Sequence, residues 1–390
     1  MTPLLRGTVV TPSGAIDDGV LALVDGVIAE VGPASAFPAA TLPAPSDRVY
    51  VPGMIDVHCH GGGGFGFPDS DADGARAAAA HHLGRGTTTM LASLVSAAPE
   101  KLLERIATLA PLVDDGTVAG LHLEGPFLAR EVCGAQDPRY IVDGDPALLA
   151  TLLDAAGGRI RSMTVAAETA HFDVLAQQLS AAGAVVSVGH TAGDYDTVAA
   201  ALGTPTGPVS ITHLFNGMHP MHHRHPGAVG AALEVAAEGR AVAEIIGDGV
   251  HLAAGTVAMV FATVGPDHVT LVSDAMQAAG MPDGQYSLGP LQVTVGDGTA
   301  RLTTPDGTPG AIAGGTSSVF DVFSRAVRYS GVPLADAARA GATTPARLLG
   351  LTDRGELSAG LRADLLELSA DLDLLRVLRG GVEVSRLSPA

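Results

Sequence analysis

The sequence predicts a (β/α)8 TIM-like barrel, because short β-rich runs alternate strictly with helical stretches rich in alanine and leucine through the middle of the 390-residue chain. The helical stretches include "DADGARAAAAHHLGRG", "PEKLLERIATLAPLV" and "HFDVLAQQLSAAG". Eight candidate strands fit the alternation, and they span 54–58, 87–92, 118–124, 162–167, 184–190, 209–213, 243–248 and 269–274. An open doubly wound sheet is the weaker alternative, because eight repeats of the alternation are the number that closes a (β/α)8 barrel.

The two ends of the chain predict a second, smaller unit. Residues 1–52 contain short apolar pieces separated by turn sequences such as Pro-Ser-Gly and Asp-Asp-Gly, and residues 356–390 have a similar pattern. Neither end can bury a sheet face well alone, so we expect them to pair in one small β-sandwich domain. The barrel would then occupy 53–355, with a β-hairpin insertion around 284–306.

Composition and charge narrow the class of protein. A hydrophobic fraction of 47% and a charged fraction of 16% allow a large core. No apolar run reaches the roughly 18 residues of a membrane span, and the N-terminus lacks the order of a signal peptide. The two cysteines, Cys59 and Cys133, suggest no disulfide framework. We therefore expect a soluble cytoplasmic protein.

The net charge of −19 argues against nucleic acid as a partner, because phosphates need a basic surface. The same charge would repel an anionic metabolite at long range. A phosphorylated substrate would therefore need a local cationic pocket on this chain.

Side chains that bind metal recur where the predicted strands end. They are His58, His60, Glu124, His190, His213 and Asp274. The carboxyl ends of barrel strands meet on one rim, where barrel enzymes have their active sites. Imidazole nitrogens and carboxylate oxygens suit zinc or iron, and a catalytic site keeps a position open for water. A further carboxylate can then carry that water's proton.

The stretch "GMIDVHCHGGGG" shows how one strand supplies two ligands. Alternate residues of a strand face the same side, so His58 and His60 can both face the barrel axis while Cys59 faces the helix layer. The glycines that follow let the backbone turn close to the site. Residues 60–63, His-Gly-Gly-Gly, could also form the oxyanion loop of an esterase. Such an enzyme needs a G-x-S-x-G nucleophile elbow, which the sequence does not contain.

The remaining histidines of note are expected to be surface, helix-layer or packing residues. They are His81, His82, His122, His171 and His268.

The chain resembles the amidohydrolase superfamily and, within it, the N-acetylglucosamine-6-phosphate deacetylases. The phrases that carry the resemblance are "VPGMIDVHCHGG", "LHLEGPF", "GHTAGDY", "THLFNGM", "HHRHPG", "DGVHL", "VSDAM" and "GGTSSVFDVF". Many other members of the superfamily bridge two metals with a carboxylated lysine from strand four. Here the only lysine, Lys101, lies in a helical stretch, and Glu124 matches the glutamate that the deacetylases use instead.

The resemblance implies a metal site of one or two divalent ions. Glu124, His190 and His213 would hold one ion, and His58 and His60 would complete a second site with Glu124 bridging and Asp274 nearby. Zinc is expected first, although iron, manganese or cobalt suit the same ligands. A metal-activated hydroxide would attack the substrate, and Asp274 would be the general base and then the general acid.

The resemblance also implies substrate contacts in the loops. Arg224 and His251 match a phosphate-binding pair, and Asn216 and Gly217 match positions that contact the sugar phosphate. The family often supplies that arginine across a dimer interface, so a homodimer is expected. Gln136 stands where many members have a histidine that contacts the acetyl carbonyl. Glutamine can donate a hydrogen bond there but carries no charge. Cys133, three residues earlier, is expected to be a small filler residue.

The predicted reaction is the deacetylation of N-acetylglucosamine 6-phosphate to glucosamine 6-phosphate and acetate. One alternative is another amidohydrolase, which acts on a different N-acyl amino sugar or on an N-acyl-D-amino acid. A second is a non-catalytic barrel that binds sugar phosphates.

Overall fold

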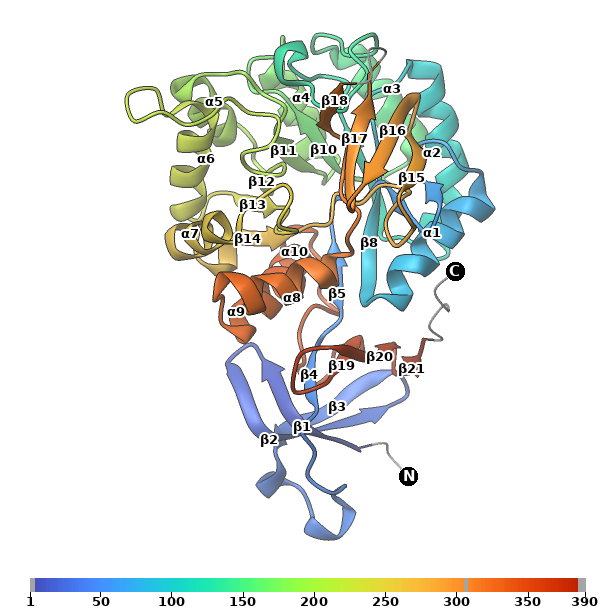
Figure 1. Ribbon diagram of the computed structural model, residues 1–390, viewed down its shortest axis with the longest axis vertical. Helices are drawn as coiled ribbons and strands as arrows, with labels where there is room; N and C mark the ends of the chain where they lie inside the picture. Colours follow the sequence, from blue (N-terminus) through green and yellow to red (C-terminus); the bar gives the residue numbers. More distant parts are fainter. Residues whose placement is uncertain (1–3, 305–307, 385–390) are drawn as a thin grey trace.

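The structure is a computed structural model that describes residues 4–304 and 308–384. It contains the predicted parallel barrel (Figure 1), and each of the eight candidate strands is confirmed, with ends that differ by a few residues. Its strands are β5 (Met54–Asp56), β8 (Thr87–Leu94), β9 (Gly120–Glu124), β10 (Ile160–Val165), β11 (Val185–Val188), β12 (Val209–Ile211), β13 (Val242–Ile245) and β14 (Val269–Leu271). Every residue of β8 and β9 is buried, as expected for parallel strands covered on both faces.

The first and last strands close the barrel just beyond their regular ends. The amide of Asp274 donates to the carbonyl of His58 at 2.9 Å, and the amide of His60 donates to the carbonyl of Ala275 at 2.7 Å. The open doubly wound alternative is therefore wrong. Closure also brings the H-x-H segment against Asp274 through the backbone itself.

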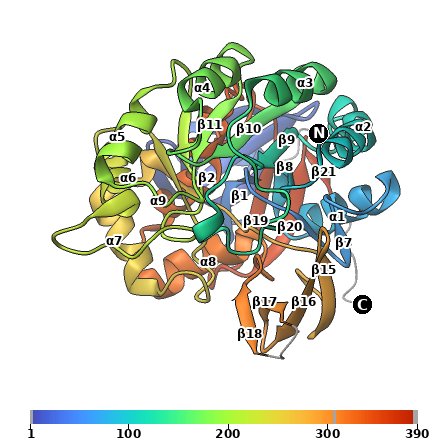
Figure 2. The same cartoon turned by 90° about the horizontal axis from the view of Figure 1, so that it is seen from above.

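Helices surround the barrel as an outer ring, which is seen from above in Figure 2. They are α1 (Ala72–Gly84), α2 (Pro99–Asp114), α3 (Pro146–Ala156), α4 (Phe172–Ala181), α5 (Tyr195–Gly203), α6 (Gly227–Ala237), α7 (Ala254–Val264), α8 (Val319–Ser330), α9 (Leu334–Ala338) and α10 (Thr344–Leu348). Side chains cap the starts of several helices. Asp145 accepts from two amides at the start of α3, and Ser318 and Asp321 form a capping box on α8.

Both ends of the described chain contribute to one small sheet below the barrel in Figure 1. Its order is β21-β20-β19-β4-β1-β2-β3. The strands are β1 (Leu4–Thr11), β2 (Gly14–Val24), β3 (Val27–Pro33), β4 (Val49–Pro52), β19 (Leu365–Leu368), β20 (Leu374–Arg379) and β21 (Val382–Glu383).

The small domain that the two ends were expected to form contains one seven-stranded sheet, and its edge strand β3 also contacts the segment before β19. The amide of Ile28 in β3 donates to the carbonyl of Leu361, just before β19. Residues from both halves share one buried cluster, which includes Leu21, Ile28 and Leu365. Residues 1–3 and 385–390 of the expected domain lie outside the described residues.

The insertion after β14 is larger than a hairpin. It is a four-stranded antiparallel sheet of β15 (Gly284–Leu288), β16 (Leu291–Gly296), β17 (Thr299–Thr303) and β18 (Pro309–Ile312). Residues 305 and 306 of the predicted segment lie outside the described residues. A further two-stranded sheet, β6 (Gly61–Gly62) with β7 (Phe65–Gly66), makes the glycine turn after His60.

None of the helices in the described part of the chain is both long and apolar enough to span a membrane.

Candidate active site

The six candidate ligands meet on one rim of the barrel, and each is at least nine-tenths buried. His58 and His60 follow β5, Glu124 is the last residue of β9, and Asp274 comes three residues after β14. His190 and His213 each lie two residues beyond the ends of β11 and β12. The prediction that strand ends bring these side chains together is therefore confirmed.

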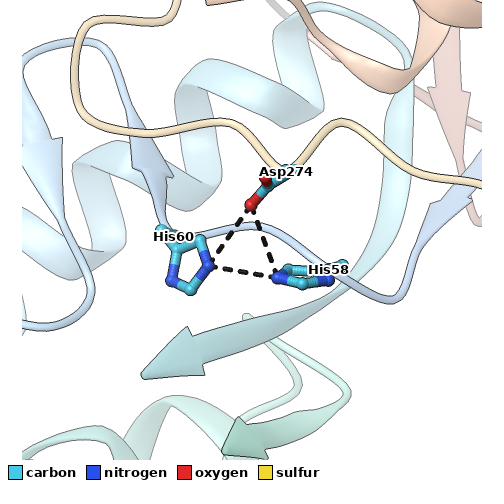
Figure 3. Close-up of side chains that lie close together, drawn as sticks. All are labelled: His58, His60 and Asp274. Atoms are coloured by element: carbon cyan, nitrogen blue, oxygen red, sulfur yellow. Dashed lines mark hydrogen bonds and ion pairs between the residues drawn. The ribbon is translucent and has the colours of Figure 1, made fainter. Parts of the chain in front are cut away.

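The first cluster is formed by His58, His60 and Asp274 (Figure 3). The Nε2 atoms of the two histidines are 3.1 Å apart. Each of these nitrogens lies 3.4 Å from Oδ1 of Asp274. The three potential ligand atoms thus point at one small volume. Cys59 faces the other way, where its sulfur lies 3.4 Å from Nε2 of His82 in helix α1.

The second cluster is formed by Glu124, His190 and His213. Oε1 of Glu124 lies 2.9 Å from Nε2 of His190 and 3.0 Å from Nε2 of His213. Glu124 also joins the two clusters, because its Oε2 lies 3.2 Å from Nε2 of His60. A carboxylate in this place is suited to bridge two ions.

The charges of the site favour bound cations. Glu124, Glu244 and Asp274 are all buried, and within the described residues their only ion-pair partners are histidines. Buried carboxylates without a lysine or arginine partner are costly unless a cation compensates them. Imidazole and carboxylate donors with converging lone pairs are the ligand set of zinc or iron. The residues present therefore fit a centre of divalent ions.

The pKa shifts of the site also indicate that it favours positive charge. Burial alone would lower the pKa of His58, His60 and His190, but the neighbouring carboxylates outweigh it and raise all three. The interior of this rim thus stabilises positive charge. Burial would raise the pKa of Asp274, but His58 and His60 lower it to about 2. Asp274 is therefore a carboxylate at neutral pH and can accept a proton.

A cavity of about 210 Å³ opens onto both clusters. Gln136, Asn216, Gly217 and His251 all line it, as do residues of the insertion such as Leu288. Gln136 is buried in the cavity wall, where its Nε2 donates to Oε2 of Glu124 at 2.5 Å. Its Oε1 accepts from the amide of Ser96 at 2.8 Å. The amide side chain therefore holds the carboxylate of Glu124 in place.

Gly217 packs directly on a candidate ligand. Its φ is +61°, and a Cβ at this position would lie 2.8 Å from Nδ1 of His190. Only glycine fits this conformation and this contact without strain. Beside it, the Asn216 side chain donates to the carbonyl of His213 at 3.2 Å.

His251 forms an ion pair with Asp248, whose Oδ2 lies 2.8 Å from Nδ1 of the imidazole. Burial alone would lower the pKa of His251, but the hydrogen bond and the charge of Asp248 outweigh it and raise the pKa. His251 is thereby suited to carry positive charge toward an anionic group in the cavity.

Arg224 lies outside this cavity. It is exposed on the loop between β12 and α6, where Nη1 donates to Nε2 of His223 at 2.8 Å. The loop projects from the barrel as a narrow hairpin, closed by backbone hydrogen bonds between His222 and His225. Within one chain, therefore, the structure does not bring Arg224 to the other candidate residues.

Two buried carboxyls in the barrel were not predicted. Glu244 in β13 lies 3.1 Å from Nδ1 of His58 through its Oε2. Asp56 in β5 accepts from the hydroxyl of Ser273 at 2.5 Å, and burial raises its pKa to about 6. Each interrupts an apolar run, "AVAEIIG" and "GMIDV", and a charged residue inside a buried strand is itself an indication of a polar site.

The five histidines assigned to other roles belong to neither of the two clusters. His82 is buried in the helix layer, His171 is exposed, and His81 and His268 are half-buried. His122 packs inside the barrel, with its ring 4.5 Å from the ring of His58.

A closed (β/α)8 barrel with two histidine–carboxylate clusters at the carboxyl ends of its strands has the architecture of a barrel metallohydrolase. The chain belongs to the amidohydrolase family, whose model matches residues 49–383.

Three known proteins illustrate the relationship. The chain is 32% identical to the N-acetylglucosamine-6-phosphate deacetylase of Bacillus subtilis (strain 168), over 96% of this chain and 95% of that protein. It is 31% identical to the N-acetylgalactosamine-6-phosphate deacetylase of Escherichia coli O157:H7, over 97% and 98%. A solved structure of a mutant N-acetyl-D-glucosamine-6-phosphate deacetylase from Mycobacterium smegmatis, in complex with N-acetyl-D-glucosamine-6-phosphate, has a TM-score of 0.91 and 39% identity, and covers 98% of this chain and 99% of that one.

Proposed function

We propose that this chain hydrolyses the acetamide of N-acetylglucosamine 6-phosphate to release acetate and glucosamine 6-phosphate. The observation that carries this proposal is the junction of two histidine–carboxylate clusters at Glu124, beside the carboxylate of Asp274 and at the floor of a cavity. The relatives named above, which match nearly the whole chain, act on N-acetylated sugar phosphates according to their names.

One divalent ion would be held by Glu124, His190 and His213. The other would be held by His58 and His60, with Glu124 between the two ions and Asp274 beside the ion of the first cluster. Zinc fits this nitrogen and oxygen set, and iron, manganese and cobalt are compatible with it. When bound, such ions activate water and polarise a carbonyl group. Gln136, which donates to Glu124, would orient the acetyl group beside it.

Asp274 would move the proton. Its carboxylate accepts a proton from the attacking water and then delivers it to the amine nitrogen, which leaves poorly without it. The hydrogen bond from the amide of Asp274 to the carbonyl of His58, which helps to close the barrel, holds Asp274 in the first cluster.

His251, Asn216 and Gly217 would contact the sugar phosphate from one wall of the cavity. Arg224 would reach the phosphate in the site of a second subunit, so we propose a homodimer. The loop that carries Arg224 also exposes 53% of the apolar residue Met221, which suits a subunit contact. A cytoplasmic location, with no nucleic acid or membrane partner, stays a prediction.

Replacing Asp274 by asparagine tests the proposed role. Asp274→Asn is expected to bind metal but to lose about 100- to 10,000-fold of its turnover, because the proton carrier is gone. Asp145→Asn is the matched control, since asparagine caps α3 as well as aspartate does. Acetate release from N-acetylglucosamine 6-phosphate is the measurement. Near-parental turnover by Asp274→Asn would remove this residue from the mechanism.

The choice of sugar is tested on the same protein. We expect the phosphorylated N-acetylglucosamine to be hydrolysed much faster than the free sugar. N-acetylgalactosamine 6-phosphate is the most informative comparison substrate, because the chain is 31% identical to an N-acetylgalactosamine-6-phosphate deacetylase. Faster release from it would change the sugar but keep the reaction. Binding of the sugar phosphate without any acetate release by metal-loaded protein would favour a non-catalytic barrel.

A further inference from the structure

The histidines of the two clusters differ on the side that faces away from the ligand volume. A histidine that binds metal through Nε2 carries its proton on Nδ1, and the acceptor of that proton orients the ring and tunes its basicity. Two of the rings use backbone carbonyls: Nδ1 of His60 lies 3.2 Å from the carbonyl of Ser93, and Nδ1 of His190 lies 3.0 Å from that of Val132.

Among the four rings, His58 and His213 differ most in the partner of Nδ1. The acceptor for Nδ1 of His58 is a carboxylate oxygen, Oε2 of Glu244, at 3.1 Å. Nδ1 of His213 is buried and has no hydrogen-bond partner among the described residues. Of these four rings, therefore, only that of His58 is backed by a negative charge.

Glu244 is held for this contact by hydroxyl groups from neighbouring strands. Its Oε1 accepts from Ser187 of β11 at 3.4 Å and from Ser210 of β12 at 3.3 Å. Its Oε2 faces His58 and receives in addition only a long contact, 3.4 Å, from the amide of His213. The two oxygens of the carboxylate thus have separate tasks, one anchored in the strands and one directed at the ligand ring.

The anchor continues across the barrel as a chain of buried hydrogen bonds. Ser187 contacts Thr212 at 2.6 Å, Thr212 contacts Thr164 at 2.9 Å, and Thr164 contacts Nε2 of His122 at 2.9 Å. The ring of His122 then packs edge-on against that of His58, with centroids 4.5 Å apart. The ring of His58 is consequently fixed from two sides by one connected polar layer.

We propose that Glu244 is the positioning residue of the first cluster, and that it sets how tightly the ion beside His58 is held relative to the ion beside His213. This inference rests on the proposed function, which places an ion in each cluster. Glu244 touches His58 and no atom of the reacting groups. Its carboxylate fixes the Nδ1–H form of the ring, directs Nε2 into the site and makes that nitrogen a stronger donor than a carbonyl acceptor would.

The test is the affinity of each ion in Glu244→Gln, measured on the full-length protein with Zn²⁺ in competition with a chromophoric chelator. The amide keeps the size of the side chain but removes its charge. We expect the ion that is lost in His58→Asn to bind roughly 10- to 100-fold more weakly in Glu244→Gln, with the other ion changed less than twofold. The visible spectrum of Co²⁺-loaded protein identifies the ion, since the band missing in His58→Asn should be the one weakened.

Glu234→Gln is the matched control, because it makes the same change of side chain at an exposed position of α6. It should change neither affinity more than about twofold. Equal weakening of both ions in Glu244→Gln would indicate a general structural role and overturn the inference, as would two unchanged affinities. A parent protein that binds a single ion at saturating Zn²⁺ would contradict the two-ion part of the proposed function and the inference with it.

A second measurement is made on the parent protein and needs the His58→Asn variant only to assign one signal. In ¹⁵N-histidine spectra of the Zn²⁺-loaded protein, His58 should carry its proton on Nδ1. The signal that disappears in His58→Asn identifies the residue. A proton on Nε2 of His58 would overturn the inference independently of the affinities.

Discussion

His190, His213 and Asp274 have backbone φ angles of 45°, 28° and 46°, in the left-handed region that residues with a Cβ rarely adopt. Each residue stands just after a barrel strand, where the chain must turn while its side chain still points at the centre. Such backbone costs about 1 to 3 kcal/mol per residue and persists where the surroundings over-determine it. Three proposed active-site residues therefore share one kind of local strain.

Gly217 is the support most easily tested at this scale. Gly217→Ala would force a Cβ toward the ring of His190 and place alanine at a φ of +61°. We expect kcat/KM to fall by up to about 100-fold, because a displaced ligand disturbs the reacting geometry. Gly255→Ala is the control, since a Cβ there meets nothing within 4 Å. Equal kcat/KM values for Gly217→Ala and the parent would contradict the proposed role of this contact.

At the scale of elements, the meeting of β5 and β14 positions the first cluster. Asp56, the last residue of β5, accepts from the hydroxyl and the amide of Ser273 and from the amide of His58. A single buried carboxyl thus ties the start of the barrel to its end. Burial raises its pKa to about 6, despite these hydrogen bonds, so the protonated form fits the fold better than the ionised form does.

The raised pKa of Asp56 predicts a dependence of stability on pH. A folded-state pKa of about 6 against an ordinary value of 3.8 means that Asp56 adds stability below about pH 4 and loses it as the pH rises through 6. The loss amounts to about 3 kcal/mol at 1.36 kcal/mol per pKa unit. The difference in unfolding free energy between the metal-free parent and Asp56→Asn should therefore change by that amount between pH 4 and pH 7.

Denaturant unfolding at several pH values measures this difference. Asp17→Asn, at an exposed position, is the control: its difference in unfolding free energy from the parent should be almost the same at pH 4 and pH 7. A pH-independent difference between the parent and Asp56→Asn would contradict the account of Asp56.

The elements were largely predictable from the sequence, because ligand-type side chains at the ends of parallel strands must share a rim. The shared position of His58, His60, Glu124 and the later candidate ligands follows from that rule alone. The polar support behind them does not, since the contact of Glu244 with His58 depends on the register of strands that lie 186 residues apart in the chain. Only the unusual glutamate within an apolar run indicated it.

At the scale of the whole molecule, the net charge of −19 leaves little to attract a phosphate at long range. Within one chain the described cavity offers His251, while Arg224 stands exposed on a projecting loop. The resemblance implies that Arg224 is a phosphate contact made across a dimer interface. If a second copy of the chain completes the site, Arg224 can contact the phosphate although it is exposed in its own subunit.

Complementation between inactive variants tests this arrangement. In a homodimer that exchanges Arg224, co-expressed Arg224→Ala and Asp274→Asn chains would form mixed dimers with one fully intact site. About a quarter of the parental activity is then expected from random pairing of two subunits. Each variant expressed alone is the control. Activity no higher than the sum of the controls would place Arg224 in its own subunit or outside the site.

The central claim is that divalent ions held at Glu124 enable this chain to deacetylate an N-acetylated sugar phosphate. The most direct test is acetate release from N-acetylglucosamine 6-phosphate by chelator-treated protein as Zn²⁺ is returned. We predict almost no release without metal, and recovery of activity as the bound ions approach two per chain. Full activity in the metal-free protein, or no acetate from the metal-loaded protein, would contradict the account.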